Sequence, residues 1–94
     1  MKDKKKFYIN GQWVNPIKAK DFNVINPSTE EVCAIISLGS SEDTDLAVKS
    51  AKSSFETWKE TSKQERIKLL EKLLEIYKSR WDEMTDAIST ELGC

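Results

Sequence analysis

The chain has 94 residues and a mass of 10.8 kDa, which allows one domain whose folding hides only about 60–65% of the unfolded surface. With 38% apolar residues, 33% charged residues and a mean hydropathy of −0.56, the composition argues against a membrane protein and a disordered chain. The net charge is −1, so no overall basic field attracts nucleic acid, and the lack of histidine removes the commonest general base and metal ligand.

The chain begins with a lysine-rich stretch, residues 2–6, which we expect to be a solvated tail. Residues 7–11 are too few and too polar for the apolar part of an export signal. Cys33 and Cys94 match no metal-binding or disulfide spacing. These features predict a cytoplasmic protein with reduced thiols and with neither a membrane nor a nucleic acid as partner.

Two β-hairpins are predicted within residues 7–38. The first covers residues 7–14, where Asn10-Gly11 is the dipeptide best suited to a type I′ turn. Its apolar face is expected to consist of Phe7, Ile9 and Trp13. The second joins residues 21–25 to residues 31–38, whose nearly continuous apolar run indicates a strand buried on both faces or covered by a helix.

From residue 40 to residue 92 the apolar period changes to about 3.6, which predicts helices. Ser40 with Asp43, and Ser62 with Glu65, fit the capping-box spacing at two helix starts. A further start at Ser79 with Asp82 would make three helices instead of two.

The helix that follows Ser62 carries apolar side chains on two faces. One face has Ile67, Leu70, Leu74, Tyr77, Trp81, Met84 and Ile88, and the other has Leu69, Leu73 and Ile76. Such a helix needs cover on two sides. Residues 7–58 are expected to cover one side, so the other predicts a larger protein or self-association into a homodimer or higher oligomer.

The usual catalytic motifs are missing, including every glycine-rich phosphate loop and any histidine-activated nucleophile. Cys33 lies in an apolar strand and is expected to be a buried filler. Cys94 follows a helix end, where the helix dipole opposes thiolate formation. We therefore predict no catalytic and no cofactor-binding residue in this chain.

Several strings together resemble the N-terminal segment of the NAD(P)-dependent aldehyde dehydrogenase superfamily. The strings are Phe7-Tyr8-Ile9-Asn10-Gly11-Gln12-Trp13-Val14, Ile25-Asn26-Pro27-Ser28-Thr29-Glu30-Glu31-Val32, Ser40-Ser41-Glu42-Asp43-Thr44-Asp45-Leu46-Ala47-Val48, Ala51-Lys52-Ser53-Ser54-Phe55-Glu56-Thr57-Trp58 and Glu65-Arg66-Ile67-Lys68-Leu69-Leu70, with Glu91-Leu92-Gly93 at the end. Residues 1–94 would then be an α+β fragment of an α/β enzyme.

The resemblance implies a parent that oxidises an aldehyde to a carboxylic acid with NAD or NADP through a cysteine thiohemiacetal. The family's catalytic and cofactor-binding motifs lie beyond residue 94, so the fragment is expected to be inactive and to bind no cofactor. Its helices would pack as outer layers on the cofactor-binding region. The family usually continues with Lys or Ala and then Pro after Glu-x-Gly, whereas this chain reads Cys94, which fits a shortened chain.

One further family feature has counterparts here. Some members hold a monovalent cation between backbone carbonyls before the Asn-Pro turn and a carboxylate near the Glu-x-Gly stretch. By motif position these ligands would be Val24, Ile25 and Glu91, with a further ligand downstream.

An alternative to the enzyme fragment is a self-standing helical module that presents its leucine-rich groove to a partner protein. Such a module would unfold cooperatively alone, whereas a fragment would bind hydrophobic dyes and unfold broadly.

Overall fold

The computed structural model describes residues 2–93, and everything said below about the structure concerns that range. The elements are β1 (Lys2–Lys4), β2 (Phe7–Ile9), β3 (Gln12–Val14), β4 (Asp21–Ile25), β5 (Val32–Ser37), α1 (Ser41–Trp58), α2 (Lys63–Ser79) and α3 (Trp81–Leu92). The chain is an α+β unit, as predicted, with strands first and helices after them.

β2 and β3 form the first predicted hairpin. Asn10 and Gly11 have φ angles of 54° and 74°, the left-handed values that a type I′ turn requires. The register pairs Tyr8 with Trp13, and their rings lie 5.1 Å apart. Because paired residues share one face of an antiparallel ladder, the prediction that Trp13 shares a face with Phe7 is wrong.

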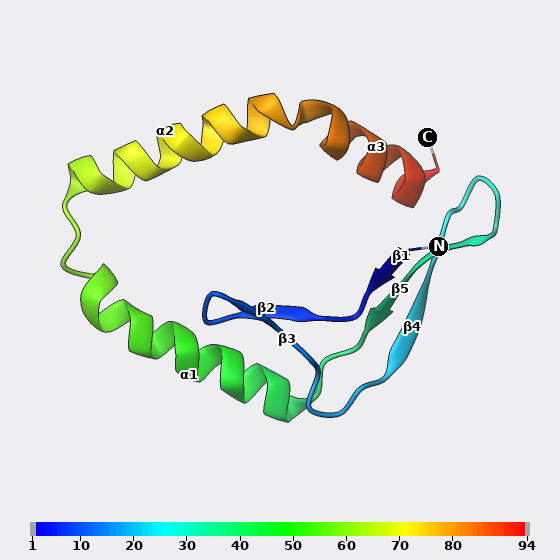
Figure 1. The fold of residues 1–94 in the computed structure, drawn as a ribbon, viewed down its shortest axis with the longest axis horizontal. Coiled ribbons are helices and arrows are strands. Elements are labelled where there is room, and N and C mark those ends of the chain that lie inside the picture. The colour runs from blue at the N-terminus through cyan, green and yellow to red at the C-terminus, as the bar shows by residue number, and fades with distance from the viewer. Residues whose placement is uncertain (1, 94) are drawn as a thin grey trace.

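β4 and β5 form the second hairpin, and β1 pairs in parallel with the other edge of β5 (Figure 1). The expectation of a solvated tail is therefore wrong for residues 2–4. The sheet ladder uses backbone N–H and C=O groups, so lysine-rich residues can join it while their side chains stay exposed. Cys33 in β5 is only partly buried, less than the apolar run predicted.

The predicted caps hold at α1 and in part at α2. Ser40 and Asp43 form a complete capping box, in which each side chain bonds the backbone N–H of the other residue. At α2 the Ser62 hydroxyl accepts a bond from the Glu65 N–H at 3.2 Å. For that pair the structure therefore shows one of the two bonds of a capping box, the one that the Ser62 side chain accepts.

The break between α2 and α3 exists, but its cap differs from the prediction. Arg80, with φ −112° and ψ 21°, separates the helices, and no side-chain hydrogen bond caps α3. The Ser79 hydroxyl instead donates to the Ile76 carbonyl at 2.7 Å. Ser79 therefore ends α2 rather than starting α3.

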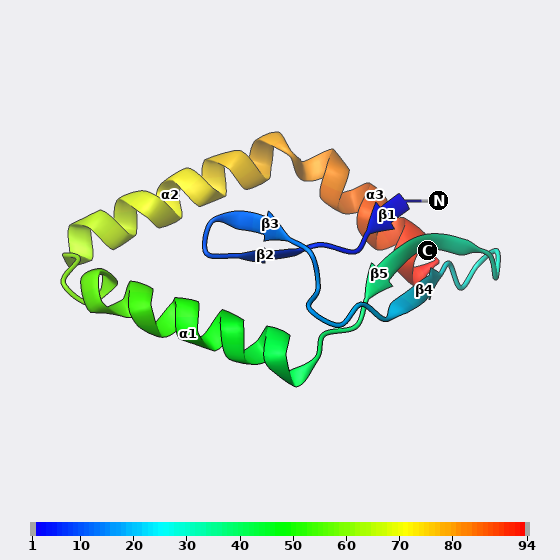
Figure 2. The same ribbon diagram turned by 60° about the horizontal axis from the view of Figure 1, so that its bottom comes forward.

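The three helices form an open arc around the β2–β3 hairpin (Figures 1 and 2). The chain extends 48 × 35 × 15 Å, so it is about one layer of secondary structure thick. Its radius of gyration is 17.0 Å, against about 12 Å for a compact domain of this length. Stable domains are built from at least two packed layers, so this arrangement lacks one.

No hydrophobic side chain among residues 2–93 is buried. The accessible surface is 8081 Å², whereas a compact monomer of this mass has about 5,500 Å². Every residue from 62 to 92 is exposed, including both apolar faces of α2. The expectation that residues 7–58 cover one face is wrong, because the hairpin packs against α1 instead.

Candidate functional site

The expected cation ligands come from the end of β4 and the end of α3. The ladder register shifts between Val24 and Ile25, which marks an irregularity in the strand at this point. The Val24 carbonyl accepts a hydrogen bond from the Cys33 thiol at 3.4 Å, and Ile25 is 45% exposed. Glu91 lies in the last turn of α3 and is exposed.

The end of α3 lies against the β4–β5 turn. Gly93 ends the helix with φ 76°, and its N–H donates to the Ser89 carbonyl at 2.9 Å. A methyl group on Gly93 would lie 2.8 Å from the Ser28 backbone nitrogen and 3.3 Å from the Pro27 side chain. The two segments that carry the expected ligands therefore meet at this point.

No cluster of three or more His, Cys, Asp or Glu side chains within residues 2–93 could hold a metal ion. That finding does not test a site made of two carbonyls and one carboxylate. The cation site at Val24, Ile25 and Glu91 therefore stays a prediction.

A groove of about 650 Å³ separates α3 and the end of α2 from β1 and β5. Its apolar floor includes Leu73, Ile76 and Met84. The two sides differ in charge, since Lys2 and Lys4 line the β1 side and acidic residues line the α3 side. Those acidic residues are Glu83, Asp86 and Glu91. Sequence reasoning missed this groove because it requires β1 as a strand.

One ion pair on the groove side lies at the start of α3, between Arg80 and Glu83. The Arg80 guanidinium donates to both Glu83 carboxylate oxygens, at 2.8 and 3.1 Å. These hydrogen bonds, with the attraction between the opposite charges, lower the pKa of Glu83 and raise that of Arg80. Both side chains are about two-thirds exposed, so the pair adds little to stability.

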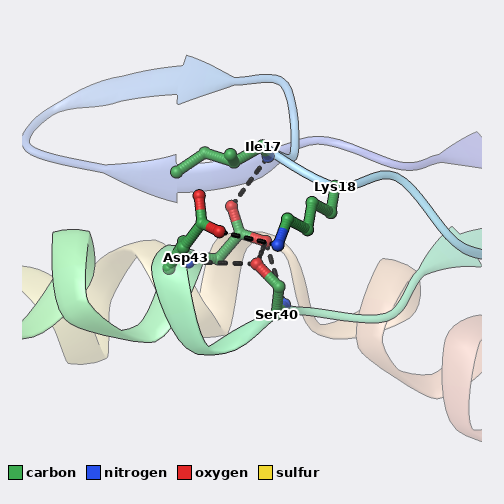
Figure 3. Close-up of polar contacts among 5 residues, drawn as sticks. Ile17, Lys18, Ser40 and Asp43 are labelled. Carbon is green, nitrogen blue, oxygen red and sulfur yellow. Dashed lines mark hydrogen bonds and ion pairs between the residues drawn. The ribbon is translucent and has the colours of Figure 1, made fainter.

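The best-formed polar cluster lies at the start of α1 (Figure 3). Asp43 is 5% exposed, and its Oδ1 accepts a bond from the Ile17 N–H at 2.9 Å. Its Oδ2 accepts bonds from the Ser40 N–H and hydroxyl, each at 2.9 Å. Nearby, Lys18 pairs with Glu42 at 2.8 Å. The capping spacing predicted the bond to Ser40, but no sequence signal pointed to Ile17.

These contacts change the acidity of Asp43. The N–H of Ile17, followed by the N–H of Ser40, stabilises the charged carboxylate and holds the pKa of Asp43 below its usual value, although burial opposes the effect. The carboxylate thus ties the loop after the β2–β3 hairpin to the first turn of α1.

Two sequence predictions concern features away from these clusters. No helix within residues 2–93 combines the length and apolar character needed to cross a membrane. Cys94, to which we assigned no catalytic role, lies outside the described residues.

The sequence profile of the aldehyde dehydrogenase family matches residues 13–94. A 3-succinoylsemialdehyde-pyridine dehydrogenase of a Pseudomonas species is 46% identical over 93 residues, which are 99% of this chain and 20% of that protein. The crystal structure of an aldehyde dehydrogenase from Bartonella henselae superposes with a TM-score of 0.98 at 53% identity. The match extends over all of this chain and over 20% of the Bartonella protein.

A second crystal structure agrees. It is a cysteine-to-alanine variant of aldehyde dehydrogenase C from Pseudomonas syringae, in complex with NAD+ and octanal, with a TM-score of 0.90 and 38% identity. It matches 92% of this chain and 18% of its own length. The strands and the arc of helices therefore reproduce the fold of one segment of each of these two structures. The chain belongs to the aldehyde dehydrogenase family, and it corresponds to an N-terminal segment that spans about a fifth of its relatives' length.

Two substitutions test how firmly α3 is seated on the β4–β5 turn. We define the grafted enzyme as the Pseudomonas relative with its matching fifth replaced by this chain. Gly93→Ala in the grafted enzyme should lower its stability by more than the roughly 1–2 kcal/mol of a left-handed alanine, because the methyl group meets the Ser28 backbone. Gly11→Ala is the control, since Gly11 has φ 74° but open space around it. Equal losses in urea unfolding would show that the contact with the turn adds nothing.

The acidity of Asp43 predicts a pH-dependent contribution to stability. Because its pKa is lower in the folded state, the contribution is complete above the unfolded value of 3.8 and is lost as pH falls through the lower folded value. Asp43→Asn should therefore lower the melting temperature of the grafted enzyme at pH 7, and the difference should shrink in acid. Glu42→Gln, the same change at an exposed neighbour, should have little effect at either pH. A difference for Asp43→Asn that is unchanged down to pH 3 would contradict this assignment.

Proposed function

We propose that this chain is the N-terminal structural segment of an NAD(P)+-dependent aldehyde dehydrogenase. In the overall reaction the aldehyde and water give a carboxylic acid, and NAD(P)+ takes up the hydride and becomes NAD(P)H with release of a proton. A cysteine outside this segment would form the thiohemiacetal. The observation that carries the proposal is that residues 62–92 are all exposed. The backbone of this chain nevertheless superposes over its full length on one segment of a much longer aldehyde dehydrogenase.

The residues described here do not fit a dinucleotide. The strand β5, Gly39 and the start of α1 give a strand–turn–helix order, in which a helix start can bind phosphate. Here, however, the Asp43 carboxylate accepts the N–H groups of Ser40 and Ile17 at this helix start, and its negative charge would repel an anion. We therefore assign the binding of NAD or NADP, and of the aldehyde, to the rest of the enzyme.

The role of the segment is to form an outer layer on the remainder of the subunit. A self-standing interaction module is not favoured, because none of the helices described here buries an apolar side chain of its own. Assembly of the whole enzyme into a homo-oligomer and its location in the cytoplasm stay predictions. Sedimentation of the grafted enzyme and fractionation of the source cells test them.

Activity of the grafted enzyme tests the proposed function. We expect it to reduce NAD+ or NADP+ in the presence of an aldehyde, followed as absorbance of the reduced nicotinamide. The Pseudomonas relative without its matching fifth should be inactive, because the surfaces that the segment covers would be exposed. This chain alone serves as a further control and should be inactive. A folded grafted enzyme that oxidises no aldehyde would contradict the proposal.

The segment also contributes to a proposed cation site, in which the Val24 and Ile25 carbonyls and the Glu91 carboxylate share a monovalent cation with a ligand from elsewhere in the enzyme. Hard oxygen ligands suit such an ion, and the contact of Gly93 with the β4–β5 turn supports the proposal.

If the site exists, K+ or Na+ should raise the melting temperature of the grafted enzyme more than tetramethylammonium does at equal ionic strength. The gain in stability is about 2.7 kcal/mol at a cation concentration 100 times Kd. Glu91→Gln should remove most of this gain, and Asp86→Asn, another acidic residue beside the groove, should keep it. An equal response to all three cations would rule the site out.

A further inference from the structure

We draw no further inference here: the strongest candidate, the basic cavity that Lys4, Lys5, Lys6 and Trp13 line at the junction of β1 and the β2–β3 hairpin, lies on a segment that spans about a fifth of its relatives' length, and nothing within residues 2–93 shows what covers it.

Discussion

The structure depends on one constraint: apolar side chains that lie on two sides of a helix must be covered on two sides. α2 carries such side chains on two of its faces, and the strands of this chain approach it from one direction only. The helices are consequently arranged as an arc around the hairpin instead of collapsing onto it (Figure 1). Hydrophobic burial is normally the largest favourable contribution to folding. In this segment it depends almost wholly on contacts with another body.

Without a core, the order of the chain comes from short-range polar contacts. The Asn10-Gly11 turn fixes the register of the first hairpin, and the capping box fixes the start of α1. Asp43 then joins these two units through the Ile17 N–H. Contacts of this kind determine where helices start and how strands turn. Each contributes only about 1 kcal/mol to stability, which is too little to replace a hydrophobic core. They set the shape that a larger body then stabilises.

Most of the elements could be predicted from the sequence because their signals are local. The turn dipeptide and the serine caps act within four residues, and the helical period repeats over whole segments. The strand β1 could not be predicted, since its pairing with β5 spans some thirty residues and uses backbone groups alone. The bond from Ile17 to Asp43 likewise joins residues far apart in the sequence, at a separation of 26 positions. Simple alternation puts Trp13 on the face of Phe7, whereas the two-residue turn pairs Trp13 with Tyr8 on the opposite face. Of the candidate site, the sequence supplied ligand positions by resemblance, but not the groove that β1 completes.

The start of α1 also supports the prediction that no dinucleotide phosphate binds between β5 and α1. A strand followed by a glycine and a helix start is an arrangement that can hold phosphate, because the helix N-terminus presents unpaired N–H groups and a positive dipole end. In this chain the same dipole end faces Glu42 and the nearly buried carboxylate of Asp43. That carboxylate accepts one N–H from the helix cap and one from a distant loop, so the favourable field of the helix is used to hold two parts of the segment together. The lowered pKa of Asp43 keeps its carboxylate ionised through the neutral range. A phosphate placed there would therefore be repelled by this negative charge. The local chemistry of α1 thus favours assembly over ligand binding.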